Sequence, residues 1–109
     1  MVVLDTNVII DRIKGKANIQ ENVTAISVIE FPLTLKYVKF KGKVYYPKLE
    51  DFKKAYKIQE KLYQIGKMKS FADLLIAAIC INKREKLVTK DTDFKDIAET
   101  SDLEVEILK

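Results

Sequence analysis

The sequence contains no histidine and only one cysteine among its 109 residues. Without histidine, the chain has no Ser-His-Asp or Cys-His catalytic group, no paired-histidine ribonuclease mechanism and no histidine-ligated zinc. The single cysteine, Cys80, allows neither an intrachain disulfide nor a thiolate zinc site, and its apolar neighbours predict a buried packing role. Hydrolytic chemistry in such a chain must draw on carboxylates, lysine, tyrosine or metal-bound water.

Long apolar segments are scarce as well. The most apolar stretch, residues 71–82, is too short to span a bilayer and carries Asp73 near its start. The first residues lack the basic region and cleavage signal of a secretory peptide, and Met1–Leu4 has the pattern of a strand. Because 48% of the residues are hydrophobic and 33% are charged, we expect one globular domain over residues 1–109. The lack of a secretory signal and of a spanning segment, together with the single cysteine, leads us to expect a cytoplasmic protein.

The net charge of +4 conceals an uneven layout. Residues 36–69 hold eleven lysines against three acidic residues, whereas residues 91–106 hold seven acidic residues against one lysine. Seven aromatic residues are interleaved with the lysines, a composition that suits a nucleic-acid backbone with stacked, unpaired bases. The alternative is a solvated helix face with core aromatics. We expect RNA contacts from Lys36, Lys39, Lys41, Lys43, Tyr45, Lys67 and Lys69.

Strand-like and helix-like segments alternate along the chain. The expected strands are Val2–Leu4, Val23–Ile26, Val44–Tyr46, Leu87–Val88 and an edge strand over Leu103–Leu108. The expected helices start at Thr6 or Asn7, Ser27, Leu49, Ser70 and Phe94, with Pro32 distorting the second of them. This alternation predicts an α/β fold with a mainly parallel sheet.

Four acidic residues stand where a strand should end or a helix should begin: Asp5, Glu30, Asp73 and Asp91. Because the carboxyl ends of parallel strands open into one crevice, we expect these side chains to lie close together. Each one also has a structural alternative. The Ser27–Glu30 and Ser70–Asp73 spacings match the helix capping box, and Asp91 can begin a turn.

Carboxylates gathered in this number repel one another, and some stay protonated unless a cation neutralises them. Oxygen ligands of this kind suit Mg²⁺ or Mn²⁺, which activate a bound water without help from histidine. Thr6, Ser27 and Thr89 each lie beside an acidic position and are candidates to fix carboxylate rotamers, although they serve equally well as caps or strand-end hydroxyls.

These segments, taken in order, resemble the successive motifs of the PIN domain, and more narrowly those of the VapC-type toxin ribonucleases of prokaryotic toxin–antitoxin pairs. The likeness rests on Asp5-Thr-Asn after a strand, Ser27-Val-Ile-Glu30, Ala72-Asp73-Leu-Leu-Ile-Ala-Ala and Leu87-Val-Thr-Lys-Asp91-Thr-Asp93-Phe94. It covers essentially the whole chain.

The resemblance implies a three-layer α/β/α sandwich and a Mg²⁺- or Mn²⁺-dependent endoribonuclease that cuts structured RNA such as transfer or ribosomal RNA. It also implies a homodimer and a VapB-type antitoxin. By motif match, Asp5, Glu30, Asp73 and Asp91 become catalytic metal-centre residues, with Asp93 as a supporting metal ligand.

Two other functions remain open from the sequence. The first is an RNA-binding or RNA-processing module on the same fold with little catalysis, which would bind RNA through the basic segment in a salt-dependent way. The second is a small signalling domain resembling a phospho-acceptor receiver. That class needs an acceptor aspartate at a middle strand end, where this chain offers Ser27 and Glu30 instead.

Overall fold

The computed structural model describes all 109 residues as alternating strands and helices. The strands are β1 (Val2–Leu4), β2 (Val23–Thr24), β3 (Val44–Tyr45), β4 (Lys86–Thr89) and β5 (Val105–Ile107). One parallel sheet has the order β1-β4-β5, and β2 and β3 form a second parallel pair. An isolated parallel bridge between Val3 and Asn22 joins the two, so the strands follow one another as β3-β2-β1-β4-β5. The predicted parallel α/β fold is confirmed, with β5 at the edge.

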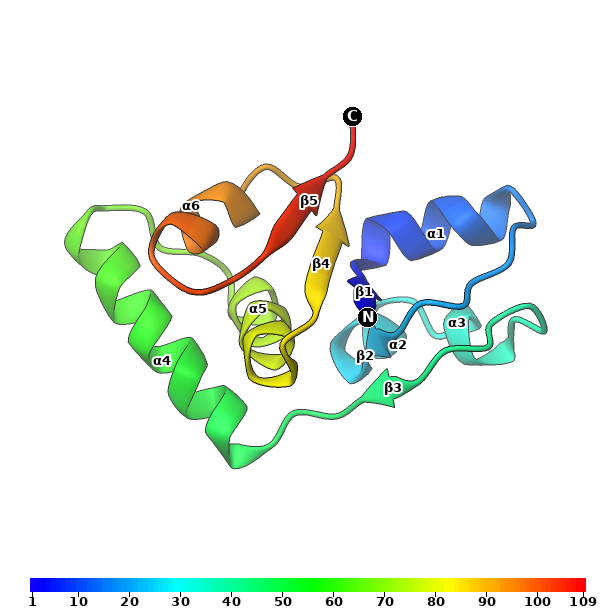
Figure 1. The fold of residues 1–109 in the computed structure, drawn as a ribbon, viewed down its shortest axis with the longest axis horizontal. Helices are drawn as coiled ribbons and strands as arrows, with labels where there is room; N and C mark the ends of the chain where they lie inside the picture. Colours follow the sequence, from blue (N-terminus) through cyan, green and yellow to red (C-terminus); the bar gives the residue numbers. More distant parts are fainter.

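Helices cover both faces of this sheet. They are α1 (Thr6–Lys14), α2 (Ala25–Glu30), α3 (Leu33–Lys36), α4 (Leu49–Gln64), α5 (Phe71–Lys83) and α6 (Phe94–Glu99). Figure 1 shows α4, α5 and α6 on one side of β4 and β5, and α1 on the other. None of the helices combines the length and the apolar character needed to cross a membrane.

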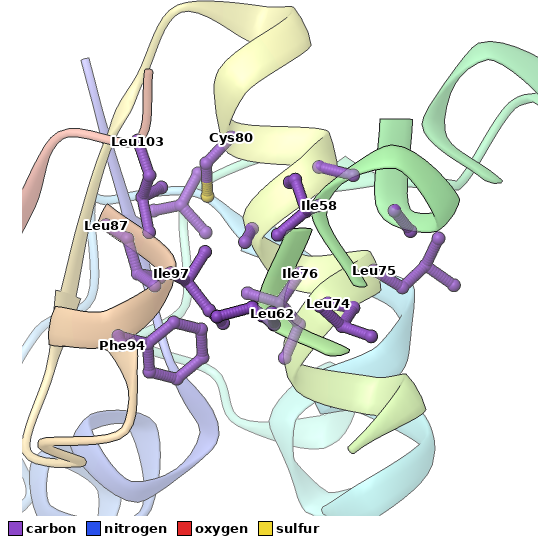
Figure 2. Packing of buried hydrophobic residues seen from close by; sticks show 14 residues of the cluster. Ile58, Leu62, Leu74, Leu75, Ile76, Cys80, Leu87, Phe94, Ile97 and Leu103 are labelled. Carbon is purple, nitrogen blue, oxygen red and sulfur yellow. The ribbon is translucent and has the colours of Figure 1, made fainter. Parts of the chain in front are cut away.

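Two hydrophobic cores account for the three layers. Val3 and Leu87 pack into the larger core with α4, α5 and α6, whereas their neighbours Leu4 and Val88 belong to the smaller core with α1. This division follows from the strand period of two, which sends successive side chains to opposite faces. Figure 2 shows the larger core, where Phe94 lies among side chains from α4 and α5. Cys80 is fully buried there, as predicted.

The structure corrects two predicted helix starts. Asp5 itself, rather than Thr6 or Asn7, caps α1 by accepting the Thr6 N–H. α2 begins at Ala25 rather than Ser27, because the Thr24 hydroxyl accepts the Ser27 N–H at 3.3 Å and ends the predicted strand early. Glu30 is therefore the last residue of α2 and does not belong to a capping box.

Pro32 divides the predicted second helix into two short ones. α2 ends at Glu30, and Phe31 takes an extended conformation with φ −140° and ψ 82° before the proline. A residue that precedes proline avoids the helical region for steric reasons, so the break follows from the sequence. The distortion expected at Pro32 is confirmed, and α3 starts directly after it.

A closed polar cluster ties together the ends of the strands opposite the acidic residues. The Tyr45 hydroxyl donates to Glu85, and the Asn22 amide donates to the Tyr45 oxygen at 3.0 Å and to Glu85 Oε1 at 2.9 Å. Lys83 lies 4.8 Å above the Tyr45 ring. Burial, and then the Glu85 hydrogen bond, raise the pKa of Tyr45 to about 12. The cluster holds β2, β3 and the start of β4 in register.

Replacing Tyr45 by phenylalanine is expected to lower the free energy of unfolding by about 1 kcal/mol, because buried Glu85 loses a donor. Urea unfolding followed by circular dichroism measures this change. Tyr46→Phe is the matched control, since Tyr46 is exposed and its hydroxyl makes no hydrogen bond. Equal stability of the two variants would contradict a structural role for the Tyr45 hydroxyl.

Candidate metal centre

Asp5 occupies the turn between β1 and α1 and is 6% exposed. Its Oδ1 accepts the Thr6 N–H at 2.8 Å, and its Oδ2 accepts the Thr89 hydroxyl at 2.7 Å. Burial raises the pKa of Asp5 above its usual range, the two hydrogen bonds oppose this rise, and repulsion from Glu30 and Asp91 adds to it. The carboxylate is thus fixed in orientation while its charge remains poorly compensated.

Thr89, the last residue of β4, connects Asp5 to Asp91. Its hydroxyl donates to Asp5 and accepts the Asp91 N–H at 3.0 Å. Asp91 in turn accepts the Asp93 N–H at 2.9 Å, which makes a tight turn before α6. The end of β4 therefore presents Asp91 and Asp93 beside the end of β1, as neighbouring parallel strands require.

Asp73 enters the same cluster from the first turn of α5. Ser70 caps that helix by accepting the Asp73 N–H at 3.2 Å, as predicted from the sequence. Carboxylate oxygens of Asp73, Asp91 and Asp93 all lie within 4.8 Å of one another. Burial, followed by repulsion from Asp91 and Asp5, raises the pKa of Asp73 to about 6. Four acidic residues from three separate segments thus feel one another's charge.

Glu30 approaches this group through Thr6. The Thr6 hydroxyl oxygen lies 2.6 Å from Glu30 Oε1, to which it donates, and 2.8 Å from the Ser27 hydroxyl oxygen. Thr6 has only one hydroxyl hydrogen, so Ser27 completes the pair by donating to Thr6. Of the three hydroxyl residues singled out in the sequence, Thr6 and Thr89 bond directly to carboxylates, and Ser27 reaches them through Thr6.

The predicted RNA-contacting residues do not lie together. Lys39 and Lys41 pair with Ile19, and the Lys43 N–H bonds to Asn22, all in the segment that leads into β3. These lysines lie near the amino ends of the parallel strands, whereas the carboxylates lie at the carboxyl ends. Lys36 is exposed at the end of α3. The Tyr45 hydroxyl donates its hydrogen to Glu85, so it cannot donate to RNA.

Lys67 and Lys69 are the predicted lysines that reach the acidic region. Lys69 Nζ lies 2.7 Å from Asp96 Oδ2 and 3.6 Å from Asp93 Oδ1. Lys67 Nζ lies 3.4 Å from Asp96 Oδ1. The bond from Lys69 holds the pKa of Asp96 below its usual range.

Sequence reasoning missed Asn7 and Lys90. The Asn7 amide donates to Asp5 Oδ2 at 3.4 Å, and its oxygen accepts the Lys90 N–H at 3.2 Å, so Asn7 joins α1 to the loop that carries Asp91. The Lys90 ammonium forms an ion pair with Asp11. The position of Asn7, two residues after Asp5, was the available signal, but the same residue type is also an ordinary helix cap.

The donor set fits a hard divalent cation. Carboxylate oxygens alone line the group formed by Asp73, Asp91 and Asp93, with Asp5 close enough to raise the pKa of Asp73. Mg²⁺ and Mn²⁺ prefer such oxygen ligands, whereas nitrogen and sulfur ligands are lacking. A cation would also remove the repulsion that raises the pKa of Asp73 and Asp5.

Comparison with solved structures places this fold among VapBC and related complexes. The chain is similar to VapBC2 from Rickettsia felis bound to a promoter DNA fragment, with 19% identity, a TM-score of 0.77 and 100% of both chains covered. It is also similar to VapBC-1 from nontypeable Haemophilus influenzae, with 20% identity, a TM-score of 0.76 and 98% of each chain covered. FitAcB from Neisseria gonorrhoeae gives 22% identity, a TM-score of 0.76 and 96% coverage of both chains. At these identities the likeness establishes the fold.

Sequence comparison gives the family. No curated protein matches the chain. The PIN domain family model matches residues 33–100, more than half of the sequence, and this range includes Asp73, Asp91 and Asp93. The fold, the order of the acidic segments and this match agree, and the chain belongs to the PIN domain family.

Proposed function

We propose that this protein is a Mg²⁺- or Mn²⁺-dependent endoribonuclease and the toxin of a toxin–antitoxin pair. The observation that carries the proposal is the convergence of carboxylates from the end of β1, the start of α5 and the end of β4 in a PIN domain. Asp5, Asp73 and Asp91 are the proposed catalytic metal ligands, Asp93 supports them, and Glu30 faces them through Thr6.

The residues of the chain set the geometry of the proposed reaction. A bound divalent ion would lower the pKa of its water for attack on phosphorus and stabilise the leaving oxygen. Thr89 and the Thr6 N–H fix the rotamer of Asp5, and the turn at Asp91 fixes the spacing to Asp93. Since the chain lacks histidine, proton transfer falls to carboxylates or water.

Structured RNA is the proposed substrate, of the transfer or ribosomal class. Besides the lysines near the acidic region, α4 presents Lys54, Lys57 and Lys61 around a hollow of about 320 Å³, which Glu60, Thr100, Ser101 and Asp102 also line. None of these three lysines has a carboxylate oxygen within 4.0 Å, so their charge is available to phosphates. We therefore propose this hollow, rather than the segment of Lys39, Lys41 and Lys43 before β3, as the RNA-binding surface of the basic region.

A VapB-type antitoxin and a second copy of the chain are the proposed protein partners. Exposed apolar side chains between α4 and α5 support the existence of a partner surface. Phe52, Tyr56 and Phe71 line a mostly apolar hollow of about 290 Å³ there, and Phe71 lies two residues before Asp73. Exposed apolar patches of this kind are typical of interaction surfaces. VapBC-5 from Mycobacterium tuberculosis, a solved structure similar to this chain, is described as a member of the VapBC family of toxin–antitoxin systems, which favours an antitoxin.

The second candidate function is an RNA-binding PIN module with little catalysis. The lysines of α4 favour it, because they lie apart from the carboxylates and need no metal. Such a module would bind RNA equally well with or without divalent ions.

The test is cleavage of a folded transfer RNA by the purified protein, with Mn²⁺ or with EDTA. We expect cleavage with Mn²⁺, none with EDTA, and none with Mn²⁺ in Asp91→Asn. Asp11→Asn is the matched control, because Asp11 is an exposed acidic residue of α1 and does not line the hollow beside α4. RNA binding without cleavage under every condition would reject the nuclease and support the binding module.

A further inference from the structure

One ammonium group lies at the edge of the acidic cluster. Lys69 Nζ stands between Asp96, at 2.7 Å, and Asp93, at 3.6 Å, and its side chain is only 10% exposed. Asp93 belongs in turn to the group with Asp73 and Asp91. The Lys69 ammonium therefore supplies a positive charge to both Asp93 and Asp96.

The backbone of Lys69 is fixed by hydrogen bonds to a side chain of α4. The Gln59 amide of α4 donates to the Lys69 carbonyl at 2.8 Å, and its oxygen accepts the Lys69 N–H at 3.1 Å. The next residue, Ser70, caps α5 and thereby places Asp73. The loop thus has one fixed path from α4 to the acidic cluster, and a long side chain that is already ordered loses little further entropy in keeping its ion pairs.

We propose that Lys69 is a built-in cation that occupies the place of a second divalent ion at Asp93 and Asp96, so that the acidic cluster holds a single ion. This inference rests on the proposed metal-dependent function. A positive charge near 4 Å disfavours a further cation at the same carboxylates, and the Lys69 end of these pairs is largely shielded from water because its side chain is 10% exposed. The single ion is left with the group of Asp73, Asp91 and Asp93, and Asp93 shares its charge between that ion and Lys69.

Lys67 offers a contrast within the same loop. Its ammonium reaches only Asp96, at 3.4 Å, and its side chain is 50% exposed. Lys67 has no ion pair with Asp93. Exposed pairs of this kind are screened by water and salt, so Lys67 leaves the count of bound ions unchanged.

The test is the number of Mn²⁺ ions bound per folded chain, measured by isothermal titration calorimetry and by electron paramagnetic resonance of free Mn²⁺. We expect one ion in the wild type and two in Lys69→Met, which keeps the aliphatic stem and removes the charge. Lys69→Arg and Lys67→Met are the matched controls, and each is expected to bind one ion. Adding Asp93→Asn to Lys69→Met should return the count to one.

The outcomes separate this inference from the function on which it rests. Two ions in the wild type would overturn the role of Lys69 and leave the metal-dependent nuclease standing, whatever the variants do. One ion in a folded Lys69→Met would overturn it as well. No Mn²⁺ binding in the wild type would overturn both the inference and the proposed metal site.

Discussion

Replacing Asp5 by asparagine is expected to slow metal-dependent RNA cleavage at least about a hundredfold, since loss of a metal ligand removes several kcal/mol of transition-state stabilisation. Asp5 is the most buried of the acidic residues in the centre, and it touches the Thr89 hydroxyl that also holds Asp91. The amide removes one negative charge at the point where the ends of β1 and β4 meet.

The fold is expected to survive this substitution. Asparagine is as good a helix cap as aspartate, so α1 keeps its first turn. The Thr89 hydroxyl can accept a hydrogen bond as well as donate one, so an asparagine NH₂ group facing it still finds a partner. Removing a buried carboxylate whose pKa is raised also relieves repulsion from Glu30 and Asp91. Thermal unfolding followed by circular dichroism checks that stability is unchanged or increased.

Asp11→Asn is the matched control for Asp5→Asn. Asp11 lies on the same helix, is exposed and pairs with Lys90. Its loss should leave the cleavage rate within about twofold, because a surface ion pair contributes little. Wild-type cleavage by a folded Asp5→Asn protein would remove Asp5 from the catalytic centre.

The placement of the carboxylates is predictable from the sequence, whereas that of the lysines is not. Asp5 and Asp91 each follow a short apolar run, and parallel strands bring such positions to one edge through backbone geometry alone. Asp73 is placed by the Ser70 cap, a local signal within three residues. Their roles as metal ligands stay predictions, because spacing locates a side chain without defining its chemistry.

Lysine contacts depend on tertiary packing that no local pattern encodes. Lys69 reaches Asp93 from a loop whose backbone is hydrogen-bonded at Lys69 to Gln59, ten residues earlier. Lys39 and Lys41 share the composition of the basic segment but lie near the amino ends of the strands. Tyr45 has the appearance of a stacking residue in the sequence, yet its hydroxyl bonds with Glu85, forty residues away. Regional composition therefore indicated a basic surface without locating it.

The same reasoning explains the helix boundaries that were predicted wrongly. Ser27 and Thr24 are both good N-cap residues, and the choice between them depends on where β2 ends. Pairing of Thr24 with Tyr45 closes the strand at that residue, so the helix starts at Ala25. This shift makes Glu30 the end of α2 and places it beside Thr6.

Asp73→Asn is expected to stabilise the metal-free protein at pH 7.5 and to have no such effect at pH 4. The Asp73 pKa is about 6 in the folded protein against an ordinary value of 3.8, chiefly through burial and then through repulsion from Asp91 and Asp5. The folded protein thus binds a proton more tightly than the unfolded chain does. The corresponding stability is fully present below pH 3.8 and is lost as the pH rises through 6.

The size of the effect is modest because Asp73 is only half buried. After allowance for solvent screening, the raised pKa corresponds to about 1 kcal/mol lost at neutral pH. Asparagine escapes this loss, which should raise the melting temperature by about 4 °C in EDTA at pH 7.5. Differential scanning calorimetry from pH 4 to 8 measures the difference between the two proteins.

Asp96→Asn provides a control of opposite sign. The bond from Lys69 holds the pKa of Asp96 below its usual range, so its carboxylate favours the folded state above the ordinary pKa. Asp96→Asn should therefore lower stability at pH 7.5. A pH-independent difference between wild type and Asp73→Asn would contradict the raised pKa of Asp73.

Added Mn²⁺ should reverse the ranking of wild type and Asp73→Asn at pH 7.5. A cation that binds only the folded state stabilises it in proportion to its occupancy, and the wild type holds the full set of carboxylates. Asp73→Asn removes the repulsion between carboxylates but also weakens Mn²⁺ binding, so this variant is stabilised less by added Mn²⁺. The same carboxylates thus destabilise the metal-free fold and bind the cation that stabilises it. A titration with Mn²⁺ tests both effects, because the melting temperature of the wild type should start below that of Asp73→Asn and end above it.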